Sequence, residues 1–203
     1  MLNELRKITK DKKNWIYKID HVSSKLDEDH SDEVKAKALW ILGEMGLNYP
    51  LEIEPCVPAI ATYLDDENPK LRQRAVNALG RIGRADKNLI TPYLNHLIEM
   101  RNDESGNVRL AFVWACENIA TNSPELFCEK LDLFYEMIND SNEKVRIESP
   151  EIFRVVGKRK PECVKPYLKK LEWIALNDTH RVVRIHSAGA VRITKNALEN
   201  LKQ

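Results

Sequence analysis

Apolar residues recur along the chain at helical spacing, in segments that repeat. After Leu71, apolar side chains follow four, seven, eight and eleven positions later, at Ala75, Ala78, Leu79 and Ile82. A stripe of this kind marks the side of a helix that packs on a core. A second helical stripe precedes each of these segments, and turn-forming residues rich in Asn, Asp and Pro separate the units. The pattern predicts pairs of helices joined by short turns.

Five such units share one register. An aliphatic residue followed by Lys or Arg recurs at intervals of 37, 37, 37 and 38 residues, at Val34-Lys35, Leu71-Arg72, Val108-Arg109, Val145-Arg146 and Val183-Arg184. An aspartate stands five residues before each aliphatic residue, at Asp29, Asp66, Asp103, Asp140 and Asp178. A residue that favours helix N-caps stands between the two, at Ser31, Asn68, Ser105, Asn142 and, one residue out of step, Thr179. This register indicates an internal repeat.

Each repeat therefore consists of a helix A, a turn with the aspartate, and a helix B that begins near the aliphatic residue. One such pair cannot bury its apolar face alone, so neighbouring pairs must stack around a shared core. We predict an all-α solenoid of about five helical hairpins, with ten principal helices and no sheet. It forms a single domain over residues 1–203, with repeats at approximately 14–48, 49–86, 87–123, 124–160 and 161–202.

The repeated signature resembles that of HEAT repeats. The HEAT unit has a proline in helix A, an aspartate in the turn, and Val followed by Arg or Lys at the start of helix B. Repeat 2 matches best, through Pro58, Asp66, Leu71 and Arg72. The other repeats lack the helix A proline and have His21, Asn95, Asp132 and Lys170 at that place. The resemblance implies a right-handed α-α superhelix, but solenoids of this class serve many functions.

We interpret the recurring aspartates and cations as structural. An aspartate before a helix can accept backbone N–H groups of its first turn, and it can pair with a cation of its own or a neighbouring repeat. Stacked repeats would align these groups as a ladder. The ladder residues are Asp29, Lys35, Asp66, Arg72, Asp103, Arg109, Asp140, Arg146, Asp178 and Arg184.

Helical geometry also predicts which helix B residues face a partner. Counted from the aliphatic residue, positions +2, +6, +9, +10 and +13 point away from the core stripe. Large apolar residues and arginines there are typical of a binding surface. The candidate partner-binding residues are Trp40, Arg81, Leu110, Trp114, Ile147, Arg154, Lys158, Ile185 and Arg192. In an alternative interpretation, Trp40 and Trp114 wedge between neighbouring B helices as core. Pro150 predicts either a kink in the fourth helix B or a late start of that helix.

The sequence lacks the motifs of catalysis and of metal binding. It contains no Walker or Gly-x-Ser-x-Gly motif, and its five histidines never pair as His-x-x-x-His. We therefore expect a protein that is not an enzyme and that uses no cofactor or metal. Cys56, Cys116, Cys128 and Cys163 lie outside Cys-x-x-Cys spacing. With no secretory signal or apolar run of about 20 residues, we expect reduced thiols, a cytoplasmic location and no membrane.

Two classes of function fit these observations. In the first, the concave helix B surface of a scaffold binds a protein or peptide. In the second, the chain binds nucleic acid as HEAT-like DNA glycosylases for alkylated bases do, with Trp40, Trp114, Arg81, Arg154, Lys158 and Arg192 gripping DNA. Residues 141–203 carry 14 Lys and Arg against 7 Asp and Glu, a net of +7, whereas residues 1–140 carry 18 against 24, a net of −6. The acidic part opposes a phosphate groove along all repeats. The aspartate that such a glycosylase needs is also missing, because the regular aspartates belong to the ladder. We favour the scaffold.

Overall fold

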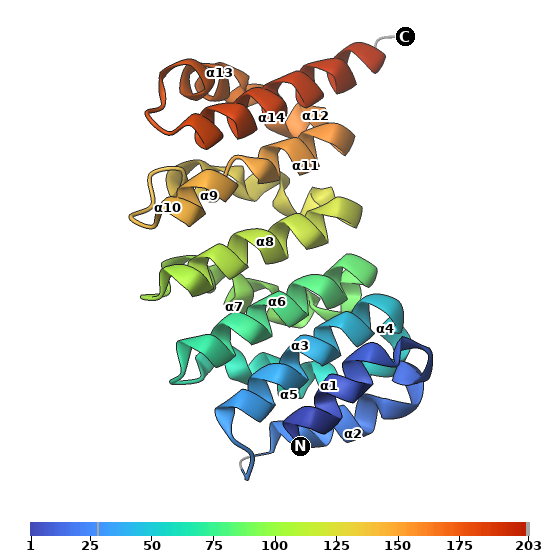
Figure 1. Cartoon of the computed structure of the whole chain (residues 1–203). Helices are drawn as coiled ribbons and strands as arrows, with labels where there is room; N and C mark the ends of the chain where they lie inside the picture. The colour runs from blue at the N-terminus through green and yellow to red at the C-terminus, as the bar shows by residue number, and fades with distance from the viewer. Residues whose placement is uncertain (28, 202–203) are drawn as a thin grey trace. The chain divides into compact units, whose positions relative to one another are not determined.

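The computed structural model describes residues 1–27 and 29–201, and every regular element in these ranges is a helix (Figure 1). The predicted all-α fold is therefore confirmed. Backbone contacts group the chain into two compact units, which we call unit 1 (residues 1–118) and unit 2 (residues 119–203). The boundary falls inside α8, and each unit is described by itself. None of the helices in the described ranges is long and apolar enough to cross a membrane.

Unit 1 contains the first two predicted repeats, most of the third, and a helix that precedes them. Its α-helices are α1 (Leu2–Lys10), α2 (Ile19–Ser23), α3 (Asp32–Asn48), α4 (Pro50–Ile53), α5 (Val57–Thr62), α6 (Pro69–Ala85), α7 (Leu94–Glu99) and α8 (Gly106–Asn122), which continues into unit 2. Its 3-10 segments are η1 (Lys12–Lys18), η2 (Ser24–Leu26), η3 (Glu54–Cys56), η4 (Tyr63–Asp65), η5 (Lys87–Leu89), η6 (Thr91–Tyr93) and η7 (Met100–Asn102).

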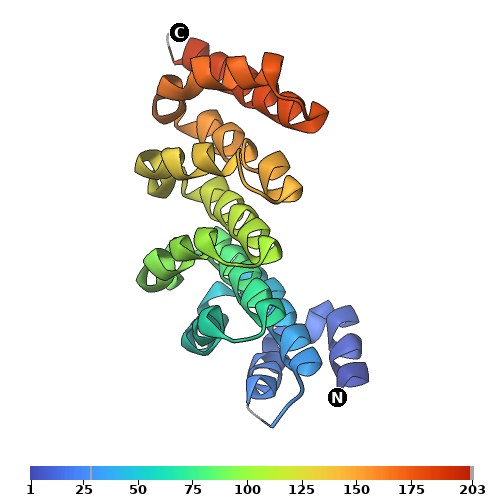
Figure 2. The ribbon, with the colours of Figure 1, turned by 90° about the vertical axis from the view of Figure 1, so that its left-hand side faces the viewer.

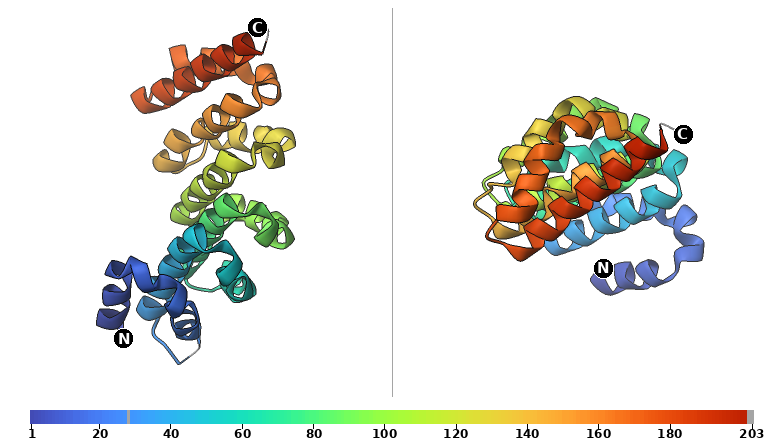
Figure 3. Two further views of the ribbon diagram at one scale, coloured as in Figure 1. Left: turned by 90° about the vertical axis from the view of Figure 1, so that its right-hand side faces the viewer. Right: turned by 90° about the horizontal axis from the view of Figure 1, so that it is seen from above.

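Unit 2 contains the last two predicted repeats. Its helices are η8 (Pro124–Lys130), α9 (Leu131–Met137), α10 (Glu143–Glu148), α11 (Glu151–Arg159), α12 (Pro161–Val164), η9 (Lys165–Tyr167), α13 (Leu168–Asn177) and α14 (Arg181–Asn200). Helices α13 and α14 pack side by side and form the last hairpin, coloured orange to red in Figure 3.

The predicted B helices are the long elements α3, α6, α8 and α14. The Asn68 side chain accepts the N–H of the residue two positions later, at 2.9 Å, and Asn142 does the same at 3.0 Å. These contacts satisfy N–H groups that a helix start leaves without a partner. The assignment of Thr179 as a cap is wrong. Because α14 begins one residue later, His180 caps it, and its Nδ1 accepts a backbone N–H at 3.3 Å.

The A helices differ from the prediction, because most are not single helices. Helix A of repeat 2 is a succession of α4, η3, α5 and η4. Prolines contribute to the interruptions in repeats 2, 3 and 5, because a proline has no N–H to donate and Pro55, Pro58, Pro92 and Pro166 lie inside these segments. The A segment of repeat 1, over residues 12–26, is also divided but contains no proline. The sequence predicted ten principal helices, whereas the described ranges contain fourteen α-helices joined by 3-10 segments.

In unit 1 the long helices pack closely against one another, beside a layer of short A-helix segments (Figure 2). A Cβ atom on Gly43 would lie 2.7 Å from Ala78 Cα, and one on Gly80 would lie 2.5 Å from Ala115 Cα. Real Cβ atoms do not approach so closely, so glycine is required at both positions. Both glycines occupy position +9, which sequence geometry placed on the outer face. The structure corrects this placement, because position +9 faces the next long helix.

In unit 2 the fourth helix B is interrupted at Pro150, as one alternative predicted. Helix α10 ends at Glu148, and α11 begins at Glu151. The Ser149 hydroxyl donates to the carbonyl oxygen of Val145 at 2.7 Å, and the Ser149 N–H donates to the same oxygen at 3.0 Å, so this buried hydroxyl next to the break has a partner. A close contact also joins α11 and α14, because a Cβ atom on Gly157 would lie 2.1 Å from Thr194 Oγ1.

The cysteines correct one expectation. Cys128 in η8 and Cys163 in α12 form a disulfide, so these two thiols are not in the reduced form that we expected from the sequence. No sequence motif indicates the pair, because the two cysteines are 35 positions apart and only the fold brings them together. Cys56 and Cys116 are free and buried.

Tyr167 lies in the last A helix of unit 2. Its ring centroid is 5.2 Å from that of Phe153. Burial of the phenol, followed by a hydrogen bond with Asp132, raises the pKa of Tyr167 to about 12. Tyr167 therefore stays protonated at pH values at which an exposed tyrosine ionises.

Candidate interaction site

The turn aspartates have a common geometry. In four repeats the aspartate Oδ1 accepts the backbone N–H two residues later, and this contact ties the turn to the start of helix B. The pairs are Asp66 with Asn68 (2.8 Å), Asp103 with Ser105 (2.8 Å), Asp140 with Asn142 (2.7 Å) and Asp178 with His180 (2.7 Å). These aspartates hold backbone groups, which is a structural role.

The ladder arginines connect the turns. Arg72 donates to both carboxylate oxygens of Asp103 in the next repeat, at 2.7 and 2.9 Å, and to the carbonyl oxygen of Asp66 in its own turn at 2.8 Å. Hydrogen bonding to Asp103 raises the pKa of the Arg72 guanidinium. In unit 2, Arg146 lies 3.5 Å from Asp178. Each of these cations reaches the aspartate of the following repeat.

The other arginines of the ladder bind their own turns. The Arg109 guanidinium donates to the carbonyl oxygens of Asp103 (2.7 Å) and Glu104 (3.2 Å). Arg184 donates to the equivalent oxygens of Asp178 (2.6 Å) and Thr179 (3.1 Å). An arginine can span two carbonyl groups and a carboxylate at once because its donors form a planar fork.

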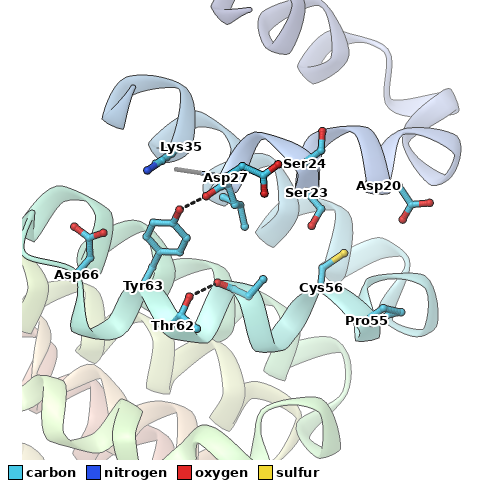
Figure 4. Close-up of a pocket in the computed structure, with 12 residues that line it drawn as sticks. Asp20, Ser23, Ser24, Asp27, Lys35, Pro55, Cys56, Thr62, Tyr63 and Asp66 are labelled. Carbon is cyan, nitrogen blue, oxygen red and sulfur yellow. Dashed lines mark hydrogen bonds between the residues drawn. The ribbon is translucent and has the colours of Figure 1, made fainter. Parts of the chain in front are cut away.

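The first rung of the ladder is different. Lys35 and Asp66 line one pocket of about 710 Å³ (Figure 4), but within the described ranges they form no ion pair. Asp29 is exposed, and neither a hydrogen bond nor an ion pair joins the described residues Asp29 and Lys35. A lysine ammonium is a single point and lacks the reach of the arginine fork. The predicted ladder therefore changes at its only lysine.

The pocket in Figure 4 has hydroxyl groups that already serve the backbone. Tyr63 donates to the carbonyl oxygen of Leu26, and Thr62 donates to that of Ala59 at 2.8 Å. Its acidic groups come from different segments, with Asp20 on α2 and Asp66 in the turn before α6. The hydrogen bond from Tyr63 to Leu26 joins repeats 1 and 2, and we assign the pocket a structural role.

The partner-binding residues predicted in unit 1 have different environments. Trp114 is 38% exposed on α8, and Trp40 is partly exposed at the equivalent position of α3. Arg81 is engaged, because its Nε lies 2.7 Å from Glu44 Oε1. Leu110 is a correction, because it is only 4% exposed. Position +2 lies on the same side of the helix as position +9, which in α3 and α6 is covered by the next long helix.

The predicted residues in unit 2 are mostly exposed. Arg154, Lys158, Ile185 and Arg192 are exposed, and Ile147 is partly exposed. Arg154 is paired with Glu151 at 2.5 Å. Arg192 lines a groove of about 540 Å³ between α13 and α14, where Lys195 and Glu172 pair at 2.6 Å. These side chains line no single pocket with one another, whereas Trp40 belongs to a defined pocket in unit 1.

The pocket at Trp40, which we call the cation pocket, is formed by three helices of unit 1. Its volume is about 420 Å³, and its lining residues are Leu2 and Arg6 on α1, Glu33, Ala36, Lys37 and Trp40 on α3, and Lys70 and Arg74 on α6. Lys37 Nζ lies 4.1 Å from the centroid of the Trp40 ring, a cation–π contact. Burial, followed by the charges of Arg74 and Arg6, lowers the pKa of Lys37. The described lining thus combines an aromatic ring with four cations and one carboxylate.

The sequence pattern predicted Trp40 as a binding residue but not the cations around it. Lys37 and Arg74 both stand at position +3 of a B helix, one turn before position +6, so a comparison of the repeats could have found them. Arg6 could not be found in this way. It lies on α1, and the N-terminal residues before the first repeat carried no repeat signature that would place a helix against α3.

Comparison with solved structures supports the same fold. An engineered protein superposes with a TM-score of 0.67 at 14% sequence identity, covering 88% of this chain and 80% of its own. A computationally designed armadillo repeat protein for modular peptide recognition has a TM-score of 0.61 at 18% identity, covering 85% and 80%. A second engineered protein has a TM-score of 0.64 at 12% identity, covering 91% and 58%. At these identities the likeness concerns the fold alone.

Comparison of sequences gives the family. A search of curated proteins finds no match. Residues 6–171 match the family described as sister chromatid cohesion protein PDS5, and this match extends over most of the chain and over both units. Together with the helical hairpins and the ladder, it establishes a HEAT-like repeat protein. The chain belongs to the PDS5 sister chromatid cohesion protein family.

Proposed function

We propose that the chain is a non-enzymatic scaffold that binds a protein or peptide on the outer face of the long helices of unit 1. The cation pocket carries this proposal, because it joins a partly exposed tryptophan to side chains from three helices. Trp114 provides a second aromatic group at the equivalent position of α8. Tryptophan and arginine are the residues that most often anchor protein partners.

The comparisons are consistent with this proposal. The designed armadillo repeat protein was made for modular peptide recognition, and its fold is the one found here. The matched family is described by a role in sister chromatid cohesion. We propose that this chain, like the designed repeat protein, uses a helical-repeat surface for recognition, here of a protein or peptide. Among the described residues, no three His, Cys, Asp or Glu side chains gather as a metal site would need.

A peptide selection tests the proposed surface. A displayed library of random peptides is selected against the whole chain, and the selected peptides are measured by calorimetry against Trp40→Ala and Trp114→Ala. Trp173→Ala is the matched control, because Trp173 is 65% exposed but lies on α13 in unit 2. We expect the first two variants to weaken binding by about 2 kcal/mol each and the control to bind normally. Equal binding by all three variants would contradict the proposal.

A further inference from the structure

The cation pocket gathers four cations in one lining without an ion pair to a carboxylate among the described residues. Other arginines of unit 1 are paired, such as Arg72 with Asp103 and Arg81 with Glu44. In the described part of the chain, no carboxylate forms an ion pair with the four cations of the pocket, which are Arg6, Lys37, Lys70 and Arg74. The polar contact of Arg6 is with the neutral side chain of Asn3, at 3.2 Å.

These cations also influence one another. The pKa of Lys37 is lowered first by burial and then by Arg74 and Arg6, so positive charge on α1 and α6 acts on the ammonium group of α3. A lysine on an ordinary solvated face would extend its ammonium group into water. Lys37 instead places it over the Trp40 ring, within the same pocket. The pocket therefore favours a negatively charged ligand, because the ligand's charge would offset the repulsion among Lys37, Arg74 and Arg6.

We propose that the cation pocket binds an acidic segment of a protein partner, with side-chain carboxylates at Lys37 and Arg74 and the adjoining chain against Trp40. The inference rests on the proposed function and adds the chemistry of the partner. Charge complementarity selects an acidic ligand, and the Trp40 ring offers an apolar contact that a peptide can use.

Other charges on the protein favour a peptide over nucleic acid. The Glu33 carboxylate lies in the lining of the pocket, and residues 1–140 have a net charge of −6. The phosphates of a nucleic acid that extends beyond the pocket would be repelled by these acidic residues. A short acidic peptide segment contacts only the pocket itself. The volume of about 420 Å³ matches a few side chains.

Fluorescence anisotropy with a labelled deca-glutamate peptide tests the inference on the full chain at low salt. The test variant is Lys37→Gln/Arg74→Gln, which removes two charges and introduces no carboxylate. The matched control is Lys10→Gln/Lys13→Gln, which removes two exposed charges of unit 1 that lie outside the pocket. We expect the test variant to bind about a hundredfold more weakly, from about tenfold for each charged contact, and the control to bind within twofold of the parent chain. Circular dichroism establishes that both variants are folded.

The other results would overturn the inference. It is wrong if both double variants lose affinity equally, or if the test variant binds as the parent chain does. It is also wrong if a short DNA duplex of equal charge binds more tightly than deca-glutamate, with a log–log salt slope near −0.9 per phosphate contact. If the peptides from the library selection need Trp40 and Trp114 but tolerate the Lys37→Gln/Arg74→Gln change, the proposed function stands and the acidic partner does not. If the selected peptides need neither the two tryptophans nor the two cations, the proposed surface is wrong as well.

Discussion

The rung between Arg72 and Asp103 allows the structural role of the ladder to be measured. The Arg72 and Asp103 side chains are only 11% and 6% exposed, and two hydrogen bonds join them. The replacement Arg72→Met keeps the apolar stem but leaves the Asp103 carboxylate buried with its contact to the N–H of Ser105. It also removes the donor to the carbonyl of Asp66. Breaking a buried ion pair costs about 3–5 kcal/mol, because the remaining charge has lost its partner.

The equivalent pair in unit 2 provides the comparison. Arg146 and Asp178 are 3.5 Å apart, and their side chains are 30% and 16% exposed. Water screens such a pair, so Arg146→Met should cost about 1 kcal/mol or less. Urea titration followed by helical circular dichroism measures both losses. Arg72→Met should therefore be the more destabilising of the two, by about 2 kcal/mol.

A double variant separates the ion pair from other effects of the substitution. Asp103→Asn keeps an oxygen that can accept the N–H of Ser105, and it removes the charge that Arg72→Met leaves unpaired. Arg72→Met/Asp103→Asn should therefore lose less stability than the two single losses added together, by about 1–3 kcal/mol. Strictly additive losses, or an Arg146→Met loss as large as that of Arg72→Met, would refute the account of the ladder.

Three further predictions follow from the contacts described above. Lys35→Arg should form an ion pair with Asp66 and so raise the urea midpoint of unfolding. An unchanged midpoint would show that the guanidinium does not reach the Asp66 carboxylate. Gly80→Val should destabilise unit 1 by at least about 1–3 kcal/mol, because the new side chain collides with the backbone of Ala115. A variant as stable as the parent chain in urea titration would contradict the close packing. Because the folded chain holds the Tyr167 proton to about pH 12 and an ordinary tyrosine releases it near 10, stability from this group is present below pH 10 and lost between pH 10 and 12. Tyr167→Phe should lose less stability than the parent over that range, as measured by urea midpoints at several pH values, and parallel profiles would exclude this role.

The sequence predicted what depends on local signals. The start of α6 follows from Asn68 and Pro69, a cap followed by a proline, and the turn at Asp66 follows from the same register. The break at Pro150 was also visible, because a proline inside a helix removes a donor. These features involve residues that are neighbours in the chain, so one repeat contains the information.

Features that depend on packing between segments were harder to predict. The apolar stripe of α8 puts Leu110 on the outer face, because the stripe reveals only the side toward the A helices, whereas a stacked helix is also covered on its flanks. The cation pocket needs Arg6 from α1 and Arg74 from α6 beside Trp40, and no single repeat contains all three. The disulfide was missed for the same reason. In each case the deciding neighbour lies in another segment of the chain.

The contact between successive long helices joins two unlike surfaces, since the backbone at Gly80 meets the side of the next helix that carries Ala115. Head-to-tail interfaces of this kind propagate into open filaments when both surfaces are presented by the same molecule. On α14, position +9 is Arg192, and position +12, which is Gly157 in the preceding repeat, is Lys195. Both side chains are exposed. Because arginine and lysine are long, a helix stacked on this face of α14 would stay farther away than glycine permits, so these two cations disfavour a filament formed by repeat-on-repeat stacking on this face.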